Sequence, residues 1–144
     1  MTVLLVEDSP GDVRLTREVF EEANPTIDIR VATDGVEAMA FLRREGVNAE
    51  APRPDLILLD LNLPRMDGRE VLAQIKGDAS LKLIPTVILT TSDSEADIAR
   101  SYELQANSYL SKPVQLHAFE QIVRGINEFW LNAAKLPRQP VPNE

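Results

Sequence analysis

Apolar residues recur along the chain in short, nearly continuous runs that are separated by amphipathic segments. A strand whose residues are apolar throughout must be covered on both faces, as in a parallel sheet packed between helices. Leu56 to Leu59 are the clearest case, because all four residues are large and aliphatic. The pattern predicts five strands, over residues 3–6, 27–31, 56–59, 87–89 and 109–110.

The amphipathic segments predict helices, and several begin with a recognisable start signal. Ser9 supplies a capping hydroxyl, Pro10 suits the first turn, and Asp12 adds an acid where the helix dipole favours one. Five strand–helix units in succession predict a doubly wound α/β fold, in which helices cover both faces of a parallel sheet. The remaining helices should begin near residues 35, 68, 94 and 115, and residues 46–54 should form a loop.

Composition limits the class of protein. With 144 residues, 44% of them hydrophobic and 26% charged, the chain suits one globular domain. The net charge of −8 would repel a phosphate backbone, so nucleic acid is not an expected partner. The absence of cysteine excludes disulfides, thiolate metal sites and a cysteine nucleophile. No signal peptide or membrane span is recognisable, so a cytoplasmic location is expected.

Carboxylates gather where the predicted strands end. Glu7 and Asp8 follow the first strand, and Asp60 follows the third. A single acid at a strand end would more often face water or cap a helix. Since parallel strands end at one edge of the sheet, however, these three should lie close together, where a cation must offset their repulsion. Mg²⁺ fits such a site because it needs few protein ligands and prefers oxygen.

Two further strand ends add chemistry to the acidic edge. Thr90 ends the fourth strand with a hydroxyl that can donate to a phosphoryl oxygen, and Lys112 follows the fifth. Pro113 fixes the backbone after the lysine, and a cis bond there would aim the ammonium inwards. Alone, Thr90 would be an ordinary strand-end hydroxyl and Lys112 a surface cation. Together with a metal and a carboxylate nucleophile they are the minimum set for moving a phosphoryl group.

These residues and their surroundings resemble the receiver domain of two-component response regulators. The resemblance rests on Leu-Leu-Val-Glu-Asp at 4–8, Leu-Asp-Leu-Asn-Leu-Pro at 59–64, Met-Asp-Gly at 66–68 and Ser-Lys-Pro at 111–113. It implies the flavodoxin-like (βα)5 fold with strand order 2-1-3-4-5. It also implies that residues 1–131 form the receiver domain, followed by a proline-containing tail over 132–144 and no effector domain.

The resemblance assigns the acidic residues to phosphorylation and metal binding. Asp60 would be the phosphoacceptor and, with Asp8 and the backbone carbonyl of Asn62, a direct ligand of Mg²⁺. Glu7 would act through water, in a position where the family often has aspartate. The side chains of Asn62 and Ser92 would flank the water that hydrolyses the aspartyl phosphate.

The other matching positions imply roles in phosphoryl binding and in switching. Thr90 and Lys112 would bind the phosphoryl oxygens, and Pro113 would orient the lysine. Tyr109 occupies the aromatic switch position, where the ring turns inward as the Thr90 hydroxyl moves towards phosphate. Without the resemblance, Tyr109 would be taken for a packing residue.

The implied function is that of a stand-alone response regulator, phosphorylated by a sensor histidine kinase. It would signal through the surface built by the fourth helix, the fifth strand and the fifth helix. The loop over 48–54, the segment 81–85 and the late aromatic helix resemble regulators paired with bacterial phytochrome-type kinases.

The late aromatic helix has more apolar residues than one buried stripe requires. A homodimer or docking surface is therefore predicted at Phe119, Ile122, Phe129 and Trp130, the alternative being that Phe129 and Trp130 only cover the sheet edge.

Three other interpretations compete with this one. A flavodoxin-like cofactor binder would need a phosphate-binding loop after the first strand, where this chain has acids. An aspartyl-nucleophile, Mg²⁺-dependent phosphatase usually has a second aspartate two positions after its nucleophile, where this chain has Asn62. A receiver-like module that binds a partner without phosphorylation would not need the full set of site residues.

Overall fold

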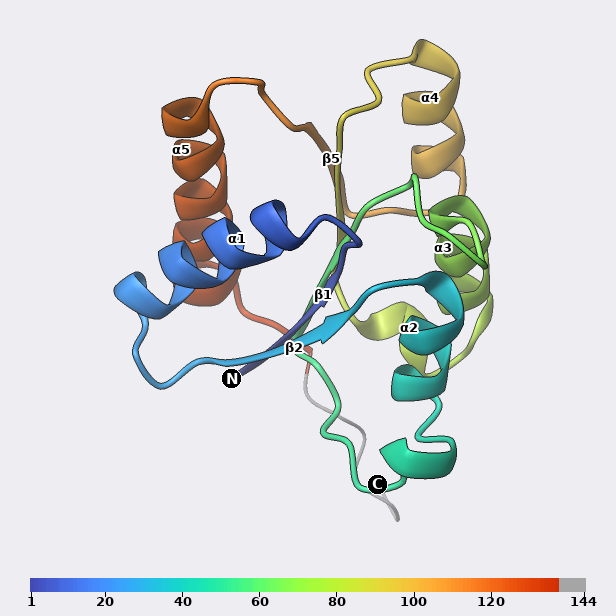
Figure 1. The fold of residues 1–144 in the computed structure, drawn as a ribbon. Coiled ribbons are helices and arrows are strands. Elements are labelled where there is room, and N and C mark those ends of the chain that lie inside the picture. Colours follow the sequence, from blue (N-terminus) through green and yellow to red (C-terminus); the bar gives the residue numbers. More distant parts are fainter. Residues whose placement is uncertain (138–144) are drawn as a thin grey trace.

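The computed structural model describes residues 1–137, so the predicted tail over 132–144 lies partly outside the described residues. Its sheet has five parallel strands in the order β2-β1-β3-β4-β5 (Figure 1). This order confirms the predicted flavodoxin-like fold. The strands are β1 (Thr2–Val6), β2 (Asp28–Ala32), β3 (Leu56–Leu59), β4 (Thr86–Thr90) and β5 (Ser108–Ser111).

Helices cover both faces of the sheet (Figure 1). On one face lie α1 (Pro10–Ala23) and α5 (Leu116–Ile126), which pack against each other. On the other lie α2 (Gly35–Leu42), α3 (Gly68–Gly77) and α4 (Glu95–Glu103). Short 3₁₀ turns, η1 (Gly46–Asn48) and η2 (Leu81–Leu83), interrupt two connections, and α5 continues into a π-helical segment, η3 (Asn127–Ala133). None of the described helices combines the length and apolar composition needed to cross a membrane.

The helix starts follow the capping residues in the sequence. The side chains of Ser9, Asp34 and Ser94 each accept a backbone amide in the first turn of the following helix. The Asp34 carboxylate makes the shortest of these hydrogen bonds, 2.7 Å from the amide of Glu37. Each cap satisfies an amide that has no partner within its helix, so the caps fix where these helices begin.

The core has two halves, one on each face of the sheet. Every residue of β3 and β4 is buried, which confirms that the apolar runs are strands covered on both sides. Phe119 lies in the half between the sheet and the pair α1 and α5, with only 4% of its surface exposed. Its assignment to a docking surface is therefore wrong. Phe119, Val123 and Ile126 share the inward stripe of α5 because their spacing matches the helical repeat.

Candidate functional site

The three acids predicted at the strand ends meet in the structure. Val6 pairs with Leu59 in the parallel ladder between β1 and β3, so Glu7 and Asp60 leave the sheet side by side. Each of Glu7, Asp8 and Asp60 offers a carboxylate oxygen, and these oxygens lie within 4.8 Å of one another. Glu7 and Asp60 are buried, whereas Asp8 is exposed. The carboxylates are therefore close enough to share a cation.

Gly68 holds the backbone close behind Asp60. Its amide donates to the Leu61 carbonyl at 2.9 Å. A Cβ atom at Gly68 would lie 2.1 Å from the Asp60 carbonyl oxygen and 2.6 Å from the Leu61 Cα. These distances are too short for any side chain unless the backbone of Asp60 and Leu61 moves. The glycine of the Met-Asp-Gly string is thus a steric requirement for the loop that carries Asp60.

Lys112 enters the acidic cluster from the end of β5. Its ammonium donates to Glu7, to Asp12 at 3.0 Å and to Asp60 at 3.2 Å, and only 5% of its side chain is exposed. The Lys112–Pro113 bond is trans, so the ammonium reaches the carboxylates without a cis bond. Sequence analysis did not assign Asp12 to the site. The available signal was its place in the first turn of the helix that directly follows Asp8.

Burial and charge govern protonation in this cluster. Burial raises the pKa of Glu7 to about 7, although the hydrogen bond and charge of Lys112 act in the opposite direction. For Lys112, burial favours the neutral amine, but the hydrogen bond and charge of Glu7 and the charge of Asp60 outweigh it and raise the pKa. The lysine is therefore an ammonium. Three carboxylates, those of Glu7, Asp12 and Asp60, contact this ammonium, and Asp8 lies beside two of them. When the four acids are ionised, they leave an excess of negative charge that one ammonium does not offset.

The donor set fits a hard divalent cation such as Mg²⁺, which prefers carboxylate and carbonyl oxygens. The two oxygens of Glu7 are already engaged, one by Lys112 and the other by the amides of Asp8 and Ser9, at 2.9 and 3.2 Å. Asp8 is exposed and its carboxylate lies beside that of Asp60. The oxygens of Asp60 accept the Asn62 amide and the Lys112 ammonium, both at 3.2 Å, so Asp8 is the carboxylate of the three with the most freedom to take a metal.

The predicted switch residues lie on the neighbouring strands β4 and β5. Thr90 is buried at the end of β4, and its hydroxyl oxygen accepts the Ser92 amide at 3.4 Å. The Tyr109 hydroxyl donates to the carbonyl of Ser92 at 2.8 Å, and burial raises the pKa of this phenol. Thr90 and Tyr109 are therefore both bound to the loop between β4 and α4.

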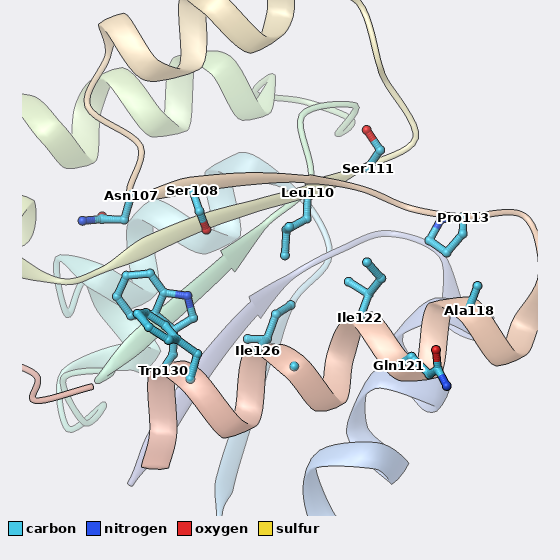
Figure 2. Close-up of a pocket in the computed structure, with 12 residues that line it drawn as sticks. Asn107, Ser108, Leu110, Ser111, Pro113, Ala118, Gln121, Ile122, Ile126 and Trp130 are labelled. Atoms are coloured by element: carbon cyan, nitrogen blue, oxygen red, sulfur yellow. The ribbon is translucent and has the colours of Figure 1, made fainter. Parts of the chain in front are cut away.

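An apolar groove of about 860 Å³ lies between the edge strand β5 and α5. Figure 2 shows Leu110 on the strand facing Ile122 and Ile126 on the helix, with Trp130 at one end. Phe129 also lines the groove, is 57% exposed and packs edge-to-face on Trp130 with ring centroids 5.1 Å apart. The predicted docking residues Ile122, Phe129 and Trp130 thus line one surface.

Comparison with known proteins agrees with this architecture. Residues 3–124 match the response regulator receiver domain family. The chain is 50% identical to the response regulator Rcp1 of Synechocystis sp. over 135 residues, 94% of this chain and 92% of that protein. The crystal structure of the Mn²⁺-bound form of Rcp1 superposes with a TM-score of 0.92, covering 95% of this chain and 99% of that one.

Two other solved structures bear on the type of regulator. The phosphorylated cyanobacterial phytochrome response regulator RcpA is 52% identical, with a TM-score of 0.93 and coverage of 95% and 98% of the two chains. The bacteriophytochrome response regulator RtBRR is 40% identical, with a TM-score of 0.75 and coverage of 96% and 83%. The chain is thus similar to regulators named for phytochrome signalling.

Proposed function

Because the chain belongs to the response regulator receiver domain family, we propose that it accepts a phosphoryl group on Asp60 from a sensor histidine kinase. The observation that carries this proposal is the contact between Lys112 and Asp60, with 3.2 Å between ammonium and carboxylate in a buried acidic cluster. A buried ammonium at that position can neutralise charge on a phosphorylated carboxylate.

Metal binding is part of the proposal. Asp8, Asp60 and the backbone carbonyl of Asn62 would hold Mg²⁺, and Glu7 would act through water. Both oxygens of Glu7 and both of Asp60 are engaged within the protein, so a metal held directly by Asp60 would replace its contact with the Asn62 amide or with Lys112. When bound, the metal supplies positive charge that offsets the carboxylates and the arriving phosphoryl oxygens. The relative Rcp1, whose structure is described as Mn²⁺-bound, has the same family fold.

The proposed transfer moves one phosphoryl group between two nucleophiles. An oxygen of Asp60 forms a bond to phosphorus while the bond from phosphorus to the kinase histidine nitrogen breaks, and the electron pair stays on that nitrogen. Lys112 and the Thr90 hydroxyl bind the phosphoryl oxygens. Water later attacks phosphorus and releases inorganic phosphate, which restores the Asp60 carboxylate. The side chains of Asn62 and Ser92 flank that water.

The proposed phosphorylation would act on partners through a change in one surface of the protein. Movement of Thr90 and Tyr109 would bias the faces of α4, β5 and α5 between two arrangements. The groove residues Ile122, Phe129 and Trp130 on that side would pair two copies of the chain. The likeness to RcpA and to RtBRR favours a phytochrome-type kinase as the partner.

Phosphorylation of Asp60 is tested with acetyl phosphate and Mg²⁺. The wild-type protein should gain one phosphoryl group, and Asp60→Asn should gain none while its circular dichroism stays the same. Asp93→Asn, which removes an exposed carboxylate from the β4–α4 loop, is the control and should label normally. Undiminished labelling of Asp60→Asn would overturn the assignment. An unlabelled wild-type protein would favour a phosphorylation-independent module, and repeated release of phosphate from unrelated esters would favour a phosphatase.

A further inference from the structure

Ser92 is the centre of a hydrogen-bond network in the loop between β4 and α4. Its hydroxyl donates to the Asp97 carboxylate at 2.6 Å, and its carbonyl accepts the Tyr109 hydroxyl at 2.8 Å. Its amide points to the Thr90 hydroxyl oxygen at 3.4 Å. The two proposed switch residues, Thr90 and Tyr109, are thus both attached to a serine that Asp97 holds through its side chain.

Arg69 holds Asp97 in turn, from the first turn of α3. Two parallel hydrogen bonds join the guanidinium to the carboxylate, at 2.8 and 2.6 Å, which is the fork geometry that makes such pairs strong. The remaining arginine nitrogen donates to Asp67 at 3.0 Å and reaches the Leu61 carbonyl at 3.5 Å. Since Leu61 directly follows Asp60, the network connects the β4–α4 loop to the segment that carries the acceptor.

Most residues of this loop are exposed. Thr91, Asp93 and Ser94 are exposed, whereas Ser92 is half-buried. The hydrogen bonds of Arg69 and Ser92 to Asp97 lower the pKa of that carboxyl to about 2, so it is ionised at neutral pH. Only 20% of the Asp97 side chain is exposed, so water competes only in part for these contacts. The Ser92 side chain is therefore held by an ionised carboxylate that is largely shielded from water.

We propose that Asp97, oriented by Arg69, is a positioning residue that holds Ser92 and thereby keeps Thr90 and Tyr109 arranged to receive the phosphoryl group at Asp60. This inference rests on the proposed function. A loop that is ordered in advance loses less conformational entropy when a ligand binds, so the network strengthens phosphoryl binding without touching the phosphoryl group. Within the described residues, no hydrogen bond or ion pair joins Asp97 or Arg69 to the carboxylate of Asp60 or of Asp8.

Beryllofluoride with Mg²⁺, which mimics a phosphoryl group on a carboxylate, tests the inference. Its half-saturating concentration, measured by fluorine NMR, should rise about threefold to tenfold in Asp97→Asn because the loop must then be ordered on binding. Arg69→Gln should shift it in the same direction. Asp93→Asn is the control, since it removes one carboxylate charge from the loop just before α4, four residues from Asp97, and should leave the half-saturating concentration unchanged or slightly lower.

A double-mutant cycle separates positioning from a general structural effect. If Asp97 acts through the Ser92 hydroxyl, Asp97→Asn should have little further effect on the half-saturating concentration once Ser92→Ala is present. The effects of the two substitutions should therefore not be additive. Fully additive shifts would overturn the inference, as would unchanged or tighter binding by Asp97→Asn. Wild-type protein that fails to bind beryllofluoride would overturn the proposed function itself. If the wild-type protein binds beryllofluoride and both Asp97→Asn and Arg69→Gln bind it equally well, only the positioning role is overturned.

Discussion

At the scale of single residues, the acidic edge is held in shape by steric limits as well as by charge. The clearest case is Gly68, because its missing Cβ leaves room for the Asp60 carbonyl and the Leu61 Cα. Both of those groups are backbone, so neither can turn aside as a flexible side chain could. A larger residue must therefore move the segment that holds the acceptor.

Gly68→Ala should lower the free energy of unfolding by about 1–3 kcal/mol, the usual effect of overpacking, and should slow phosphorylation by acetyl phosphate. Urea unfolding and phosphoryl labelling measure the two effects. Gly77→Ala, at the other end of the same helix, is the control, because a Cβ there meets nothing within 4 Å. It should be neutral or mildly stabilising. Equal stability of the two alanine variants would contradict this account of the Met-Asp-Gly string.

Asp97 should contribute a pH-dependent part of the stability. Its pKa is lowered from 3.8 to about 2 in the folded protein, first by the hydrogen bond from Arg69 and then by that from Ser92. A carboxyl with a lowered folded pKa stabilises the protein above its unfolded pKa, and this contribution disappears as the pH falls through the folded value. Wild-type protein should therefore unfold at a higher temperature than Asp97→Asn at pH 6, and the difference should shrink between pH 4 and pH 2. A difference that stays constant down to pH 2 would contradict the shift.

At the scale of elements, helix starts are local and are easily predicted from sequence. A capping side chain and the amide it accepts are only a few residues apart, so their types and spacing are enough to find them. Asp34 is an example, with its carboxylate 2.7 Å from the amide of Glu37. The same carboxylate lies 3.5 Å from the guanidinium of Arg65, whose side chain is exposed, so this pairing should contribute little.

Asp34→Ala should lower the free energy of unfolding by about 0.5–2 kcal/mol, because the first turn of α2 loses its cap. Asp34→Ser is the matched variant, since serine can still accept the amide although it lacks the charge. Chemical denaturation of both proteins measures the difference. Equal losses in the two variants would show that the charge of Asp34, and not its capping hydrogen bond, stabilises this helix start.

Contacts between elements were harder to predict. The strands and the cluster of Glu7, Asp8 and Asp60 follow from the sequence because parallel strands end at one edge, whatever the detailed packing. The contacts of Asp12 with Lys112 and of Arg69 with Asp97 join residues 100 and 28 positions apart, and they depend on how helices sit on the sheet. Phe119 was misplaced for a related reason, since an apolar excess on a helix does not say which of its members face the core.

At the scale of the whole molecule, charge and apolar surface act against each other. The net charge of −8 makes two copies of the chain repel. The groove between β5 and α5 exposes Phe129 and adjoining aliphatic residues, whose burial would favour pairing. The proposed homodimer therefore has a long-range electrostatic cost, which salt reduces, and a short-range hydrophobic gain, which salt does not weaken.

The balance predicts how self-association responds to salt and to substitution. Sedimentation velocity should show a larger dimer fraction at 0.5 M than at 0.05 M NaCl, because the screening length falls from about 14 Å to about 4 Å. Phe129→Ser should reduce that fraction, since it removes an exposed ring from the groove. Leu116→Ser is the control, because Leu116 is 64% exposed at the start of α5 but is not among the residues that line the groove. If Phe129→Ser and Leu116→Ser weaken dimerisation equally, the contact lies elsewhere on the molecule. If the protein is a monomer at both salt concentrations, with and without phosphorylation, the proposed homodimer is excluded.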